Sequence, residues 1–170
     1  MPEPLENPLY YLHNFRQVLH WLGQRYGDLL DPDEQHFIQQ FDSLPQASQA
    51  LLVRMVMRKG VHFRAGKLSY PEIGCTQGAI GPLRELGWVD DQHPLAFDAL
   101  FALLQKGELL SAFKPWIDQP KGRKSDWLQG LSAHFTDRRS FAGWCPELAD
   151  TLYSLTVMEL CDRLRLMFFG

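Results

Sequence analysis

Apolar residues recur every three or four positions through most of the N-terminal part of the chain, and this spacing is the strongest constraint on its fold. Over residues 9–30 they form one helical stripe, which predicts a helix ending near Gly27. Asp31 and Pro32 then stand where an N-cap residue and a first helical residue are favoured. A second helix is therefore expected to begin there.

A third helix, expected over residues 48–59 with Ser48 as its cap, is followed by a change of period. Apolar and polar residues alternate over residues 61–65, which favours a short strand or a hairpin. Another helix is expected over residues 76–86, and an extended segment at residues 88–89. Helix, helix, strand, helix and strand in this order is the skeleton of a winged helix-turn-helix, which contacts duplex DNA.

The second half of the chain also shows helical periodicity. Residues 95–104 and 108–114 predict two helices, and a third is expected to start at Ser125 after a turn rich in proline, glycine and lysine. The result would be a compact helix-turn-helix whose basic elbow could hold a backbone phosphate at a helix N-terminus. From Pro146 onward, the apolar spacing predicts one continuous helix through Met167.

Together these elements predict a mainly α fold with a short β-hairpin, in which a winged-helix-like unit precedes a helix-turn-helix. The expected boundaries are residues 1–92 for an N-terminal DNA-binding unit, 93–140 for the second unit, and 141–170 for the start of a helical connector. A chain of 170 residues, 45% of them apolar, can bury the core of one domain or of two small ones.

Basic residues are concentrated in two blocks, although the net charge of the chain is -3. Residues 51–84 carry six basic residues against one acid, and residues 106–139 carry seven against four. Such blocks are typical of nucleic-acid binding, and solvated helix faces give the same pattern. The candidate phosphate-binding residues are Arg54, Arg58, Lys59, Arg64 and Lys67 in the first block, and Lys121, Arg123 and Lys124 in the second.

The sequence contains no catalytic or metal-binding constellation. Its three cysteines are odd in number and far apart, which argues against a disulfide framework and a Cys-x-x-Cys zinc site. The six histidines lack ligand spacing, and the glycines match no phosphate loop. No apolar run reaches the roughly 18 residues of a membrane span. We therefore expect a cytoplasmic protein with no catalytic residue, metal ligand or cofactor of its own.

Several motifs, which follow one another in a defined order along the chain, are more specific than its composition. The N-terminal part contains Tyr10-Tyr11-Leu12-x-x-Phe15-x-x-Val18-Leu19, then Gln49-Ala50-Leu51-x-Val53-Arg54-x-x-x-Arg58-Lys59, then Lys67-Leu68-x-Tyr70-x-Glu72-Ile73. These motifs resemble the Fanconi-associated nuclease family. In the second half, Glu108-Leu109-x-x-x-Phe113-Lys114 and Gly122-x-Lys124-x-x-Trp127-Leu128-x-x-Leu131 resemble that family's SAP motif, a helix pair that grips duplex backbone. Pro115 and Gly130 depart from the SAP pattern.

The resemblance implies a repair nuclease for interstrand crosslinks, which cuts near 5′ flaps, nicks and branched junctions with magnesium or manganese. It also implies that the cutting VRR-NUC domain lies outside this chain, because none of the six lysines has the acid two positions earlier that an Asp…Glu-x-Lys metal site needs. The chain would then hold duplex backbone at a nick or 5′ flap and position it for the nuclease domain of the same parent chain. The implied location is the nucleoid in a bacterium or the nucleus in a eukaryote, with no membrane partner.

Two other functions remain open on the sequence alone. A stand-alone helix-turn-helix regulator would prefer a DNA sequence, whereas the positioning region of a nuclease would prefer a DNA structure. A helical protein-interaction domain would instead use its apolar C-terminal helix as a docking face, and its binding would be independent of salt.

Overall fold

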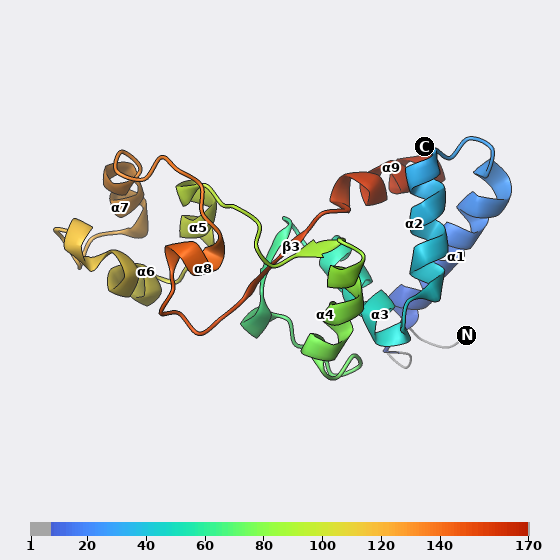
Figure 1. The fold of residues 1–170 in the computed structure, drawn as a ribbon, viewed down its shortest axis with the longest axis horizontal. Helices are drawn as coiled ribbons and strands as arrows, with labels where there is room; N and C mark the ends of the chain where they lie inside the picture. The colour runs from blue at the N-terminus through green and yellow to red at the C-terminus, as the bar shows by residue number, and fades with distance from the viewer. Residues whose placement is uncertain (1–7, 170) are drawn as a thin grey trace. The chain divides into compact units, whose positions relative to one another are not determined.

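The computed structural model describes residues 8–169, which form two compact units (Figure 1). The first unit joins the chain up to Asp90 with the segment from Ser154 onward, and the second comprises Asp91–Tyr153. Both are mainly helical, and the β-structure is short, so the predicted fold class is confirmed. Among the described residues, no helix combines the length and the apolar character that crossing a bilayer requires.

Three helices open the first unit: α1 (Tyr10–Tyr26), α2 (Pro32–Ser43) and α3 (Gln46–Met57). The predicted start of α2 is confirmed. The Asp31 carboxylate accepts a bond from the Glu34 backbone N–H at 2.8 Å, and the Glu34 carboxylate accepts one from the Asp31 N–H at 2.9 Å. Such a reciprocal cap stabilises a helix by about 1 kcal/mol.

The predicted cap at Ser48 is wrong, because α3 begins at Gln46. The Ser48 hydroxyl is buried and donates a hydrogen bond of 2.7 Å to the carbonyl oxygen of Ala79 in α4 (Thr76–Glu85). The helix α3 is buried around most of its circumference, since it lies against both α1 and α4. A polar side chain on such a helix needs a partner inside the protein, and Ala79 supplies it.

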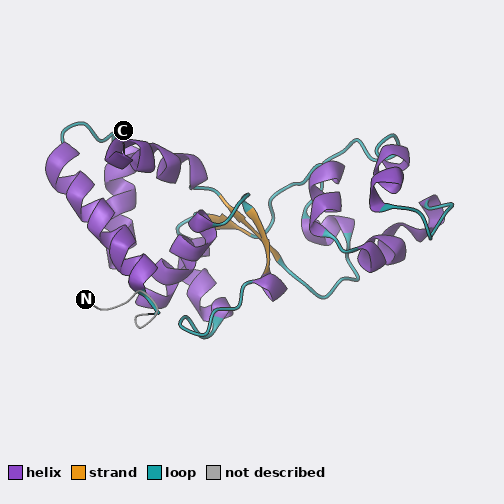
Figure 2. Cartoon of the chain, turned by 180° about the vertical axis from the view of Figure 1, so that it is seen from behind, coloured by secondary structure: helices purple, strands orange, loops and turns teal. Residues whose placement is uncertain are grey.

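A three-stranded sheet completes this unit, in the order β1 (His62–Arg64), β3 (Leu152–Leu155) and β2 (Val89–Asp90) (Figure 2). The strand β2 pairs antiparallel with β3, so that Val89 lies opposite Leu155. The short strand predicted at residues 61–65 is confirmed, but the predicted hairpin is wrong, because no second strand follows within residues 65–75. Its neighbour in the sheet is the distant strand β3, and a 3-10 turn, η1 (Ala65–Lys67), follows it directly.

The continuous helix predicted from Pro146 to Met167 is wrong. The strand β3 interrupts it, and the helix α9 (Met158–Phe169) begins after the strand. All four residues of β3 are buried, and strands flank it on both sides. A short apolar run of this kind looks the same as part of a buried helix, so its periodicity cannot reveal the strand. The boundary between the units falls within β3, so that residues 141–153 lie in the second unit and residues 154–169 in the first.

The helix α9 packs against the N-terminal helices. Arg163 Nε lies 3.2 Å from Oε2 of Glu34, whose side chain is only 7% exposed. The rings of Trp21 in α1 and Phe168 in α9 meet edge-on, with centroids 5.1 Å apart. Part of the apolar face of this helix is thus covered by α1 and is not free for docking.

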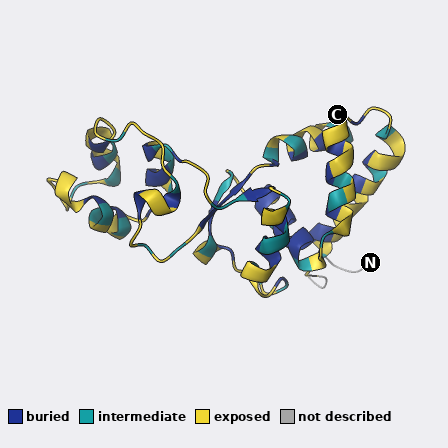
Figure 3. Ribbon diagram, viewed as in Figure 1, coloured by how far each residue is buried: buried dark blue, intermediate teal, exposed yellow. Residues whose placement is uncertain are grey.

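The second unit contains four helices and a 3-10 turn: α5 (Phe97–Leu103), α6 (Lys106–Phe113), η2 (Lys114–Trp116), α7 (Lys124–Leu131) and α8 (Phe141–Trp144). Its core is aromatic: the ring centroid of Phe97 lies within 5.9 Å of the ring centroids of Phe101, Phe113, Phe135 and Trp144. Figure 3 shows buried inner faces and exposed outer faces on the helices of each unit. Each unit therefore has its own core.

Candidate nucleic-acid interface

Arg54, the first candidate phosphate-binding residue, is bound by a carboxylate of the protein. Its Nε and Nη2 atoms donate to Oε2 of Glu72 at 3.0 and 2.8 Å. The hydroxyl of Tyr11 in α1 donates to the same oxygen at 2.7 Å. The Glu72 side chain is 8% exposed, so one buried carboxylate serves three donors. We refer to Glu72, Tyr11 and Arg54 as the Glu72 cluster.

The electrostatics of the Glu72 cluster favour one protonation state. Burial alone would raise the pKa of Glu72, but the hydrogen bonds from Tyr11 and Arg54 together lower it below its ordinary value. Burial and the bond to Glu72 raise the pKa of Tyr11 to about 12. Burial acts to lower the pKa of Arg54, and its bonds to Glu72 and Tyr11 outweigh this and raise it. At neutral pH, an ionised Glu–Arg pair therefore lies beside a neutral tyrosine.

Aromatic rings extend the Glu72 cluster toward the surface. The Arg54 guanidinium lies 4.3 Å from the ring centroid of Tyr11 and 4.9 Å from that of Tyr70. Nη1 of Arg58 donates to the Tyr70 hydroxyl at 3.3 Å, and its guanidinium lies 5.4 Å from the ring of Phe63. Arg58 is exposed whereas Arg54 is only partly so. Arg54 thus supports the surface from which Arg58 projects.

The other cations of the first basic block differ in exposure. Lys59 follows α3 and precedes Gly60, whose φ of 81° turns the chain toward β1. Lys59 and Lys67 are both exposed. Arg64 is only 9% exposed in β1. Among the candidate residues of this block, surface charge therefore comes from Arg58, Lys59 and Lys67, and Arg84 in α4 is a further exposed cation.

The second basic block divides in the same way. Lys121 and Arg123 are exposed in the loop before α7. Lys124, the first residue of α7, donates from Nζ to the carbonyl oxygen of Leu104 at 2.7 Å, and it lies 5.3 Å from the ring centroid of Phe101. A cation is favoured at that carbonyl because it lies at the C-terminal end of α5. Lys124 therefore joins α7 to α5, while Lys121 and Arg123 present charge to solvent.

Two neighbouring hollows lie in the first unit, where α3 and α9 face each other. The larger has a volume of about 410 Å³ and is lined mainly by apolar side chains of α1, α3 and α9. The smaller has a volume of about 340 Å³, and its lining includes Arg58, Lys59, Asp162 and Arg165. The two hollows share Val56, Met57 and Arg165. They are therefore two parts of one groove, which we call the α3–α9 groove.

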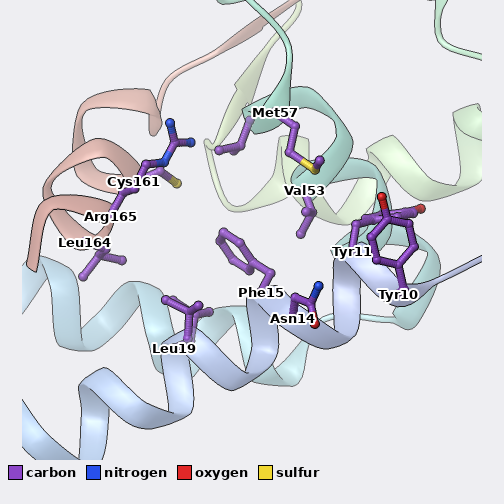
Figure 4. A pocket seen from close by; sticks show the side chains of 12 residues that line it. Tyr10, Tyr11, Asn14, Phe15, Leu19, Val53, Met57, Cys161, Leu164 and Arg165 are labelled. Atoms are coloured by element: carbon purple, nitrogen blue, oxygen red, sulfur yellow. The ribbon is translucent and has the colours of Figure 1, made fainter. Parts of the chain in front are cut away.

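Figure 4 shows the apolar part of the α3–α9 groove, with Tyr10 and Tyr11 at one end and the α9 side chains Cys161, Leu164 and Arg165 at the other. The ring of Phe15 lies between these ends. Burial raises the pKa of Cys161 to about 12, so its thiol is neutral and a poor nucleophile at neutral pH. Within residues 8–169, no three His, Cys, Asp or Glu side chains are grouped so that they could hold a metal ion.

Sequence reasoning did not identify Arg165 or Tyr11. The position of Arg165 beside Arg58 depends on β3, which returns the chain to the first unit. Glu72 did give a signal, since it is the one acid within the basic block of residues 51–84. A lone acid among six cations suggests an internal ion pair. That Tyr11 also binds this acid could not be predicted from the sequence, because the contact depends on how α1 packs.

Comparison with known proteins places both units in one family. Residues 9–90 match the family described as FAN1, HTH domain, and residues 94–144 match the Fanconi anemia-associated nuclease SAP domain. A Fanconi-associated nuclease 1 homolog of Pseudomonas aeruginosa is 54% identical over 98% of this chain. The chain belongs to the Fanconi-associated nuclease family. The resemblance found in the sequence motifs is thereby confirmed.

Other members of the Fanconi-associated nuclease family match as well. A homolog from Arabidopsis thaliana is 26% identical over 85% of this chain and 18% of its own length. A crystal structure of paFAN1 bound to 2nt 5′ flap DNA with gap is 52% identical, with a TM-score of 0.92 over 98% of this chain. A second, with 1nt 5′ flap DNA, is 54% identical, with a TM-score of 0.93 over 96% of this chain. The chain spans about 30% of the Pseudomonas relative and of each of these structures.

Proposed function

We propose that this chain binds nicked, 5′-flapped or branched DNA and positions it for a metal-dependent DNA-repair nuclease. The observation that carries the proposal is the similarity to paFAN1 structures that contain 5′ flap DNA, because it extends over both units of this chain. The exposed cations of the two basic blocks support it. Interstrand crosslink repair is the process in which this binding would act.

We assign phosphate contacts to those candidate cations that the protein leaves at its surface. These are Arg58, Lys59 and Lys67 in the first unit, and Lys121 and Arg123 in the second. Arg54, Arg64 and Lys124 were candidates on the sequence as well. Their burial or internal partners suit them better to holding the shape of the interface. Because phosphates are common to all DNA, this set of contacts would recognise structure more than sequence.

We assign cleavage to regions of longer family members that lie outside the matched residues. The magnesium or manganese of such a phosphodiesterase needs several carboxylates close together, and the described residues group no such ligands. The partners of the chain are accordingly DNA and the nuclease domain of a longer protein. Its place in the cell would be the nucleoid or the nucleus.

Fluorescence anisotropy of the 170-residue chain, without metal, tests this function directly. Plain duplex, nicked duplex and 5′ flap DNA are titrated at several salt concentrations. We expect the nicked or flapped DNA to bind more tightly, with an affinity that falls linearly on a logarithmic salt scale. Preference for one palindromic sequence, equal for nicked and intact sites, would instead identify a transcriptional regulator. No binding at low salt would refute DNA binding.

A double substitution of Arg58→Ala with Lys59→Ala tests the residue assignment. Two lost phosphate contacts should lower the salt slope by about 1.8 on every duplex substrate. Arg25→Ala is the matched control, because Arg25 is an exposed arginine at the end of α1 in the same unit and lies over the ring of Trp21. An unchanged slope in the double variant would remove both residues from the interface.

A further inference from the structure

The apolar part of the α3–α9 groove presents rings and a thioether to solvent. Tyr10 is 42% exposed and Met57 is 58% exposed, which is unusual for large apolar side chains that line a hollow. Asn14 lines the same hollow and carries both a donor and an acceptor. A hollow of about 410 Å³ lies within the range of cavities that bind small ligands. These groups suit a flat ring that has polar edges.

The second part of the α3–α9 groove is cationic. Arg58, Lys59 and Arg165 line it, and Asp162 is the one acid among its lining residues. The Nη1 atom of Arg165 lies 3.9 Å from Oδ1 of Asp162, a distance too long for a hydrogen bond. Most of the donors of the exposed Arg165 guanidinium are thus not used by Asp162, and they suit an anion with several oxygens.

We propose that the α3–α9 groove binds one unpaired nucleotide of single-stranded DNA, with the base in the apolar part and a phosphate beside Arg58, Lys59 and Arg165. The proposal rests on the proposed function and names a feature of its substrate, the unpaired strand of a flap. Stacking of a base on side-chain rings with a nearby cation for the phosphate is the general way in which proteins bind single strands.

The charges of the groove favour a nucleotide over the other occupants of an apolar hollow. A purely apolar peptide would leave the three cations with Asp162 as the one acid beside them. Intact duplex could not insert a base that remains paired and stacked. An acidic amphipathic peptide has the same general chemistry as a nucleotide, so the test must separate the two. Since Met57 and Arg165 line both parts of the groove, one ligand can occupy both at once.

Anisotropy titrations of the 170-residue chain test the proposal with an oligothymidylate of about ten nucleotides, a 5′ flap duplex and a blunt duplex. Tyr10→Ala should weaken binding of the oligothymidylate and the flap by about fivefold to tenfold, because a stacking surface is lost. Arg165→Ala should lower the salt slope on the oligothymidylate by about 0.7, the value for one phosphate of a single strand. Asp162→Asn should tighten binding. Tyr10→Ala should not change binding of blunt duplex, because a fully paired duplex offers no unpaired base to stack.

Matched controls are available on α1 and just beyond it. Leu29→Ala removes an apolar side chain that is 73% exposed and lies outside the groove, and Arg25→Ala removes an arginine outside it. Both should bind the oligothymidylate as the wild type does. Urea unfolding midpoints of all variants must agree with that of the wild type, which excludes misfolding as the cause of weaker binding.

The outcomes separate this proposal from the proposed function. If blunt duplex binds and Tyr10→Ala and Arg165→Ala leave oligothymidylate binding unchanged, the nucleotide site is wrong and the duplex interface stands. If the wild-type chain binds none of the three DNAs, both proposals are wrong. If Tyr10→Ala abolishes binding of an acidic amphipathic peptide but not of oligothymidylate, the groove is a protein-docking site and the nucleotide proposal fails.

Discussion

Replacing Glu72 with glutamine keeps the shape of the side chain but removes the charge shared by Tyr11 and Arg54. One oxygen of Glu72 accepts three hydrogen bonds from these residues. A bond to a charged group contributes about 1 kcal/mol more than a neutral one, so the change costs up to about 3 kcal/mol. Water restores part of this because Arg54 is 35% exposed. We expect Glu72→Gln to lower the free energy of unfolding by about 2 kcal/mol.

Urea unfolding followed by tryptophan fluorescence near neutral pH measures this loss, and the melting temperature should fall by about 4–8 °C. The effect should depend on pH in a defined direction. Because folding lowers the pKa of Glu72, its stabilisation is present above the ordinary value of 4.5 and is lost as the pH falls through the lower folded value. The wild type and Glu72→Gln should therefore converge in acid.

The exposed pair of Asp137 and Arg139 provides the control for Glu72→Gln. Its atoms lie 2.6 Å apart, closer than those of the Arg54–Glu72 pair, but both side chains are about half exposed. Asp137→Asn should leave the unfolding curve unchanged, because exposed pairs contribute little. If Glu72→Gln unfolds at the wild-type urea concentration, or if its deficit persists in acid, burial is not what makes the Glu72 cluster stabilising.

Other predictions concern single side chains. Folding raises the pKa of Tyr11 from 10.0 to about 12. The contribution of Tyr11 to stability should therefore be constant below pH 10 and fall by about 1.4 kcal/mol per pH unit from pH 10 to about 12, a loss absent from Tyr11→Phe in urea titrations. A thiol reagent should modify the exposed Cys75 in the native protein, but the buried Cys161 only after urea unfolding. Peptide mass spectrometry identifies the labelled cysteine, and rapid labelling of Cys161 in the native protein would contradict its burial. Lys124→Met should destabilise the protein by about 1 kcal/mol, because the hydrogen bond from Lys124 to the Leu104 carbonyl oxygen is lost. Lys121→Met should leave the stability unchanged. Equal urea midpoints for the two variants would contradict the structural role of Lys124.

Local signals in the sequence predicted much of the fold. The cap at Asp31 and the apolar stripe of α1 depend on contacts within one or two helical turns, and both elements form where expected. The strand β3 gave no such signal, because its pairing partners lie far away in the sequence and all its side chains are buried. Ser48 was misjudged for the same reason, since its partner Ala79 belongs to another helix.

The sequence by itself determined the helical class, the two basic blocks and the family resemblance, because periodicity, charge and motif spacing are properties of neighbouring residues. Only the tertiary structure decided which charges remain available to a ligand. It buries Arg54 partly against Glu72, bonds Lys124 to Leu104, and brings Arg165 beside Arg58 and Lys59. The physical reason is that a charge is available for binding only if folding leaves it solvated and with donors to spare. Packing decides this, because it sets which groups become its neighbours in space.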